Sequence, residues 1–111
     1  MDNDKISVAD FLKAHNIHIG DVVRLTTNNT KEEYIAVSRP VIPVNNGELN
    51  YNDAYIFVIP KDLLDTSKDY REQLKEIYRG RKDNIENKRP DIMRQCYTAN
   101  LIDIKKIDTV I

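Results

Sequence analysis

The stretch AYIFVIP, residues 54–60, constrains the fold of this chain more than any other part of the sequence. In an extended strand successive side chains point to opposite faces, so Tyr55 and Ile59 would share one face, and Ile56 and Val58 the other. Both faces are apolar, which indicates a strand covered on both sides. We therefore predict a central strand here, ended by the proline that closes the run.

Two earlier stretches show the period-two alternation of strands. They are residues 17–27, IHIGDVVRLTT, and residues 33–39, EYIAVSR. The polar, turn-rich NNTKEE between them predicts an antiparallel hairpin. Further along, Pro40 and Pro43 lack amide donors, so RPVIPV is expected to be an edge strand or an extended segment. Residues 45–53, NNGELNYND, are predicted to form a turn and loop.

Two stretches have the period of amphipathic helices. Residues 7–16, SVADFLKAHN, predict a short N-terminal helix, and residues 67–79 predict the longest helix, with Ser67 or Thr66 as its N-cap and Gly80 as its stop. The apolar stripe of the longer helix consists of Tyr70, Leu74, Ile77 and Tyr78. Each helix therefore has one face to bury against the sheet.

The C-terminal part of the chain is less clearly patterned. Residues 81–90, RKDNIENKRP, are predicted to be a charged loop. Residues 91–111 contain a β-like stretch and an apolar tail whose pattern fits either a strand or a short helical turn. Together these elements predict one α+β domain of residues 1–111. Its core would be a small curved antiparallel sheet or partly open β-barrel, with the N-terminal helix and the longer helix packed against it.

Composition excludes several classes of protein. The chain is 41% hydrophobic and 32% charged, as expected of a folded domain, and no apolar run approaches the roughly 20 residues that span a bilayer. Its first residues, MDNDKISVAD, are acidic and polar, unlike a signal peptide. We therefore predict a cytoplasmic protein with no membrane partner. The net charge of −1 is well short of a nucleic-acid-binding signature.

The common catalytic and metal-binding signatures are missing from the sequence. The three glycines are far apart, so there is no phosphate-binding loop, and His15 and His18 would straddle a helix end, which disfavours a shared metal. Cys96 is the single cysteine, with strand-like neighbours, and is interpreted as a small buried residue. The sequence therefore predicts no catalytic residue, no metal site and no cofactor.

A run of cations at the end of the longer helix is the strongest candidate binding feature. Arginine and lysine in such a run suit docking to an acidic protein or to phosphates, although they also complement the negative end of a helix. Tyr51, in a polar loop, is a further candidate, because an exposed tyrosine is a good contact anchor. The predicted partner-binding residues are Arg71, Lys75, Arg79, Arg81, Lys82, Lys88, Arg89 and Tyr51.

Four short motifs resemble the MazF/PemK-like toxins. They are GDVV (20–23), AVSRPVI (36–42), YIFVIP (55–60) and CYTANLIDIKKI (96–107). The resemblance implies a small, highly curved β-barrel, cleavage of RNA without a metal, and a homodimer. Arg39, Lys31 or Thr66 would then belong to the cleavage site. However, Lys61 follows Pro60 where that family has threonine or serine, so the sequence predicts that the chain is not an active nuclease.

Three functions are consistent with these observations. The first is a small non-enzymatic binding or regulatory protein, such as an inhibitor from a phage or mobile element. It would dock on a macromolecule, and a protein is the favoured partner. The second is a MazF/PemK-like endoribonuclease toxin or an inactive relative. The third is a nucleic-acid-binding accessory protein that uses the basic segment 79–89.

Overall fold

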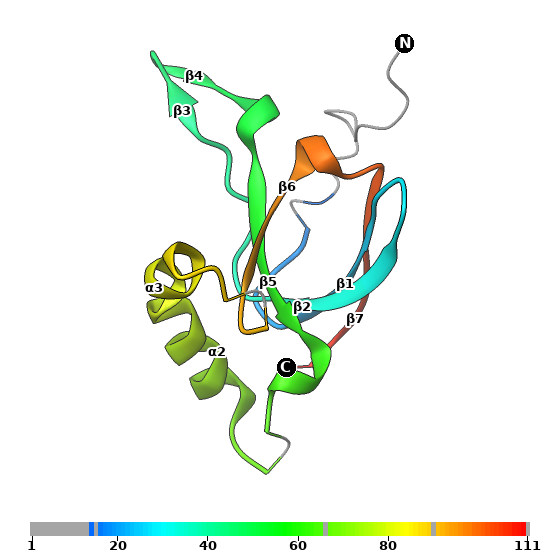
Figure 1. The fold of residues 1–111 in the computed structure, drawn as a ribbon, viewed down its shortest axis with the longest axis vertical. Helices are drawn as coiled ribbons and strands as arrows, with labels where there is room; N and C mark the ends of the chain where they lie inside the picture. The colour runs from blue at the N-terminus through cyan, green and yellow to red at the C-terminus, as the bar shows by residue number, and fades with distance from the viewer. Residues whose placement is uncertain (1–13, 15, 66, 90, 111) are drawn as a thin grey trace.

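The computed structural model describes residues 14, 16–65, 67–89 and 91–110. It is a mixed structure of helices and strands built on one five-stranded antiparallel sheet with the strand order β6-β5-β2-β1-β7 (Figure 1). The strands are β1 (Asp21–Thr26), β2 (Lys31–Ala36), β5 (Tyr55–Pro60), β6 (Arg94–Tyr97) and β7 (Asp103–Thr109). The predicted α+β class with an antiparallel sheet is confirmed. The described strands do not close into a barrel, because β6 and β7 end the sheet on opposite sides.

Strand β5 is buried on both faces, as predicted from its two apolar sides. Ile56 and Val58 belong to one apolar cluster, which we call the inner core, and Phe57 and Ile59 belong to a second, which we call the helix-side core. All four are at most 8% exposed. The strand lies between β2 and β6, one place away from the middle of the sheet, which β2 occupies.

Strands β1 and β2 form the predicted hairpin. Val23 lies opposite Tyr34 in the register, and the turn is closed by a 2.8 Å bond from the Thr27 amide to the Thr30 carbonyl. Alternation along β1 sends Val23 to the inner core and Val22 to the helix-side core. The sheet is therefore covered on both faces along this hairpin as well.

The proline-containing segment between β2 and β5 contributes little to the main sheet. Val41 makes an isolated bridge to Tyr55, after which β3 (Val44–Asn45) and β4 (Glu48–Leu49) form a separate two-stranded hairpin that projects from the body (Figure 1). Residues 45–53, predicted to form a turn and loop, contain the turn but also strand residues of this hairpin. Asn46 and Gly47 have φ values of 53° and 81°, which fit the tight turn that a two-residue hairpin loop requires. A short 3₁₀ helix, η1 (Tyr51–Asp53), follows.

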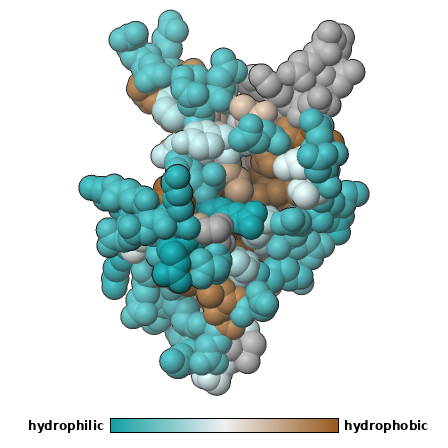
Figure 2. All heavy atoms as spheres, in the orientation of Figure 1, coloured by the Kyte–Doolittle hydropathy of each residue, from teal (hydrophilic) through white to brown (hydrophobic). Residues whose placement is uncertain are grey.

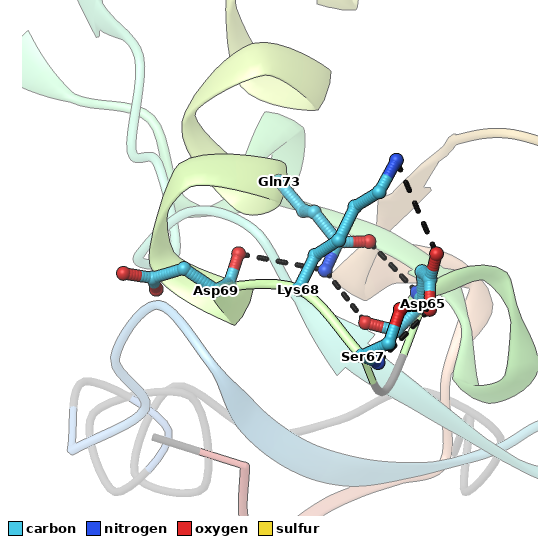
Figure 3. Close-up of polar contacts among 5 residues, drawn as sticks. All are labelled: Asp65, Ser67, Lys68, Asp69 and Gln73. Carbon is cyan, nitrogen blue, oxygen red and sulfur yellow. Dashed lines mark hydrogen bonds and ion pairs between the residues drawn. The ribbon is translucent and has the colours of Figure 1, made fainter.

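The longer helix starts later than predicted. Helix α2 (Tyr70–Arg79) is capped by Asp69, whose carboxylate accepts a 2.8 Å bond from the Arg71 amide, and not by Ser67 or Thr66. Ser67 is bound instead to the Asp65 carboxylate through its amide and its hydroxyl (Figure 3). The predicted apolar stripe is confirmed, since it packs on the helix-side core.

The segment after Gly80 is helical, which corrects the predicted charged loop. Helix α3 (Arg81–Glu86) follows α2 directly, with Gly80 between them at φ −85° and ψ 7°, which is outside the helical region. Ile85 packs against the helix-side core, which gives this short charged helix one apolar anchor. The basic segment is thus carried by an ordered element.

The C-terminal part of the chain forms strands, which resolves the alternative left open by its sequence pattern. Two further 3₁₀ turns, η2 (Lys61–Leu63) and η3 (Thr98–Asn100), follow β5 and β6 respectively. Strand β7 then pairs with β1 and sends Ile104 into the inner core. The predicted N-terminal helix lies outside the described residues, apart from Ala14 and Asn16, of which Ala14 packs in the inner core.

Candidate functional site

A cleft follows strand β6 at one end of the sheet. All four residues of β6 line it, and its volume is about 510 Å³, within the usual range for binding clefts. We call it the β6 cleft. Ile85, Met93 and Leu101 give it apolar walls, and Lys88 lies among its polar lining. Figure 2 shows a hollow in this view of the molecule with hydrophobic residues inside it and hydrophilic residues around it.

A second hollow of about 550 Å³ adjoins the first and lies beside α3. We call it the α3 cleft. Arg79, Arg81 and Lys82 line it together with Phe57. Ile85 and Gln95 line both clefts, so the two hollows meet at these side chains. The clefts therefore form one continuous face that runs from the end of α2, past α3, to the edge of the sheet.

Arg79, Lys82 and Lys88 at this face make no ion pair and no side-chain hydrogen bond within the described part of the chain. All three are exposed. The segment 79–94 holds six basic and three acidic residues, so its net charge is positive although that of the whole chain is −1. A cleft with cations at its border attracts acidic groups and speeds their encounter.

The two remaining predicted cations at this face are already engaged. The Arg81 guanidinium donates a 2.9 Å bond to the Tyr78 carbonyl and lies 4.1 Å from the centre of its ring. Arg89 donates two bonds, of 3.0 and 3.2 Å, to Asp91, and this pair raises the pKa of Arg89 and lowers the pKa of Asp91. Arg89 therefore offers less uncompensated charge than its position in the sequence suggests.

Three other predicted binding residues lie away from the clefts. Arg71 and Lys75 are on earlier turns of α2, and Lys75 pairs with Glu72 at 3.5 Å. Tyr51 lies in η1 and is half-buried. The structure thus brings together Arg79, Arg81, Lys82, Lys88 and Arg89, and it separates Arg71, Lys75 and Tyr51 from them.

Sequence reasoning missed the contribution of β6 and its neighbours. Arg94 and Gln95 line the β6 cleft, with the amides of Asn84 and Asn100 nearby. Arg94 lies over the Tyr34 ring, at 5.6 Å from its centre. The sequence signal was the alternation in RQCY, which indicates a strand but does not indicate that the strand lies at an edge beside α3.

Two potential nucleophiles near the cleft are held in their neutral forms. Burial raises the pKa of the Cys96 thiol to about 11. Burial, together with a hydrogen bond from the Tyr34 hydroxyl to Glu32, raises the pKa of Tyr34 to about 12. A thiol reacts as its thiolate, so Cys96 is poorly suited to nucleophilic chemistry at neutral pH.

Two of the residues that the MazF/PemK resemblance would place in a cleavage site lie apart in the described part of the chain. Lys31 begins β2 and Arg39 follows its other end, so the whole strand separates them. Thr66 lies outside the described residues. In the described part of the chain, no group of three histidine, cysteine or carboxylate side chains could hold a metal, and no helix could span a membrane. Comparison of the chain with protein-family models, curated proteins and solved structures gave no match.

Proposed function

We propose that this chain is a binding protein that docks on an acidic partner protein through the face formed by the β6 cleft and the α3 cleft. The observation that carries the proposal is the placement of Arg79, Lys82 and Lys88 around apolar hollows without ion pairs among the described residues. Apolar area supplies affinity in protein interfaces, and complementary charge at their border speeds association and fixes orientation.

The composition of the face favours a protein over a nucleic acid as the partner. Asp83, Glu86 and Asp91 are interspersed with the cations, so the face lacks the unbroken basic stripe that is typical of nucleic-acid-binding surfaces. The apolar walls of the β6 cleft cannot contribute to contacts with backbone phosphates, whereas they can pack against aliphatic side chains of a partner protein. The resemblance to MazF/PemK-like toxins stays a prediction, as does the lack of nuclease activity.

The test compares a site variant with a matched control of equal charge. The site variant carries Lys82→Glu and Lys88→Glu, and the control carries Lys68→Glu and Lys105→Glu, two exposed lysines that line neither cleft. The probes are a fluorescent glutamate-rich peptide, a single-stranded RNA and a duplex DNA, titrated by fluorescence anisotropy at low and moderate salt. We expect the peptide to bind the parent chain and the control, and the site variant to bind about tenfold more weakly.

Two results would contradict the proposal. One is peptide binding that the site variant and the control weaken equally, which would show only a response to net charge. The other is tighter binding of RNA or DNA that depends on Lys82 and Lys88, which would make the face a nucleic-acid surface. Urea unfolding of both variants is the control for folding, because exposed charges contribute only about 0–1 kcal/mol to stability.

A further inference from the structure

The hydrogen-bonding pattern of β6 fixes which of its backbone groups face β5. The Thr98 amide donates a 2.9 Å bond to the Ala54 carbonyl, and the same register places Cys96 opposite Ile56. In an antiparallel ladder, opposed residues alternate between pairs that exchange hydrogen bonds and pairs that do not. Cys96 and Arg94 therefore bond to β5, and Gln95 and Tyr97 turn their N–H and C=O groups away from it.

The bonds on the other side of β5 support this assignment independently. Phe57, which lies opposite Gln95, accepts from the Val37 amide at 3.0 Å and donates to the Ser38 hydroxyl at 3.2 Å. Tyr55, which lies opposite Tyr97, exchanges two backbone bonds with Val41, of 2.7 and 3.0 Å. The backbone groups of both β5 residues thus point away from β6, as the alternation requires.

The outward groups of Gln95 and Tyr97 face the edge of the sheet along which the β6 cleft runs. Both residues line that cleft. No strand pairs with this edge in the described part of the chain. An extended segment placed in the cleft could therefore bond to up to four outward backbone groups, as in recognition by strand addition.

We propose that the β6 edge accepts an extended acidic segment of the partner protein as a sixth strand of the sheet. This inference rests on the proposed function and adds the mode of binding. Gln95 lies on the same face of the sheet as Phe57, which is the face covered by the helices, and it lines the α3 cleft with Lys82. Alternate side chains of an added strand would therefore point toward Lys82 and Lys88. The intervening side chains would point toward the inner face, where Cys96 and Leu101 offer apolar contacts.

Charge complementarity selects an acidic partner over a second copy of this chain. Two β6 edges paired with each other would bring the positively charged segment 79–94 of one copy toward the same segment of the other. Like charges opposed across strands are destabilising. A segment that alternates acidic and apolar residues matches both faces of the edge instead.

The experiment uses a short peptide of alternating glutamate and valine and two N-methylated isomers of it. One isomer is methylated on the glutamates and the other on the valines. All glutamate side chains lie on one face of the extended peptide, and all valine side chains lie on the other. A shift of the peptide by one residue would point the valines at Lys82 and Lys88. In the bound peptide, therefore, only the glutamate amides or only the valine amides can face β6. Loss of those bonds should weaken binding of one isomer about tenfold or more, and the other isomer should bind like the parent peptide.

Hydrogen exchange of the Gln95 and Tyr97 amides gives a second readout. We expect both amides to exchange rapidly in the free protein and to be protected in the complex. Slow exchange in the free protein would show that the edge is already occupied, and concentration-dependent dimerisation that slows these amides would assign it to a second copy. Either result would overturn the inference.

The outcomes separate this inference from the proposed function. If both isomers bind as well as the parent peptide, and Lys82→Glu with Lys88→Glu still weakens binding, the partner docks by charge without strand addition. In that case the inference fails and the proposed function stands. If no peptide binds while RNA or DNA does so through the same lysines, the proposed function fails, and the inference fails with it.

Discussion

The two edges of the sheet, β6 and β7, are built differently. Strand β7 has seven residues and carries Lys105 and Lys106 at its centre. Its register with β1 shifts at Ile107, so one residue bulges out of the ladder. Strand β6 has four residues in continuous register with β5, and its Tyr97 packs edge-on against Tyr55 with ring centres 5.6 Å apart.

Bulges and charged side chains are the usual means by which an edge strand avoids unwanted pairing. The β7 edge has both, and Lys106 is held by an ion pair of 3.5 Å with the buried Asp21. The β6 edge has no bulge, and a cleft runs along it. The difference teaches that one sheet can have a bulge at one edge and an unbroken register at the other.

The largest expected effect tests how each edge is anchored. Phe57, opposite β6, is 8% exposed and contacts the rings of Tyr55 and Tyr78, so Phe57→Ala should cost about 3–5 kcal/mol. Ile107 of β7 is 41% exposed, so Ile107→Ala should change stability by about 0.5 kcal/mol or less. Urea unfolding measures both. Similar losses in the two variants would remove the contrast between the edges.

A smaller effect tests the direction of the backbone groups in β6. Cys96→Pro removes an amide that bonds to β5 and leaves a carbonyl of that strand without its partner, which should cost about 1–3 kcal/mol. Gln95→Pro removes an amide that points away from β5, and proline is tolerated at such positions of edge strands. This substitution should therefore lower the free energy of unfolding by less. If Gln95→Pro is the more destabilising substitution in urea unfolding, the alternation is inverted and the outward groups are those of Cys96.

The smallest effect concerns pH and the tyrosine under Arg94. The pKa of Tyr34 is raised from 10 to about 12, so the unfolded chain loses this proton first as the pH rises. Its contribution to stability is complete below pH 10 and is lost between pH 10 and about 12. The Tyr34→Phe variant should lose less stability over that interval in urea unfolding. Equal losses in the two proteins would show that the folded chain does not hold Tyr34 neutral.

Local patterns were sufficient for much of the fold. The two apolar faces of β5 and the stripe of α2 are properties of consecutive residues, so the sequence displays them directly. The start of α2 depends on a distant contact, since Gln73 receives a 2.7 Å bond from the Asp65 amide and donates one of 2.9 Å to the Asp65 carbonyl (Figure 3). These bonds fix Asp65 against the first turn of α2, in addition to the cap that Asp69 supplies within the local sequence.

The candidate site was predictable only where its residues are consecutive. The cations of segment 79–89 stand out as a run, but the sequence does not show that Asp91 engages Arg89 or that α3 exists. Helix α3 depends on the contact of Ile85 with a core assembled from several strands. The edge position of β6 follows from strand order, which no pattern within RQCY can specify.

The strand order also governs how the chain reaches this structure. Strand β1 pairs on one side with its neighbour β2 across a short turn, and on the other side with β7, where Asp21 lies opposite Thr109. Closing that long loop costs more chain entropy than closing the hairpin, so the β1–β2 hairpin has the advantage as an early step in folding. During synthesis on the ribosome, Ile104 can complete the inner core only after β7 has emerged, and until then β1 has an unpaired side.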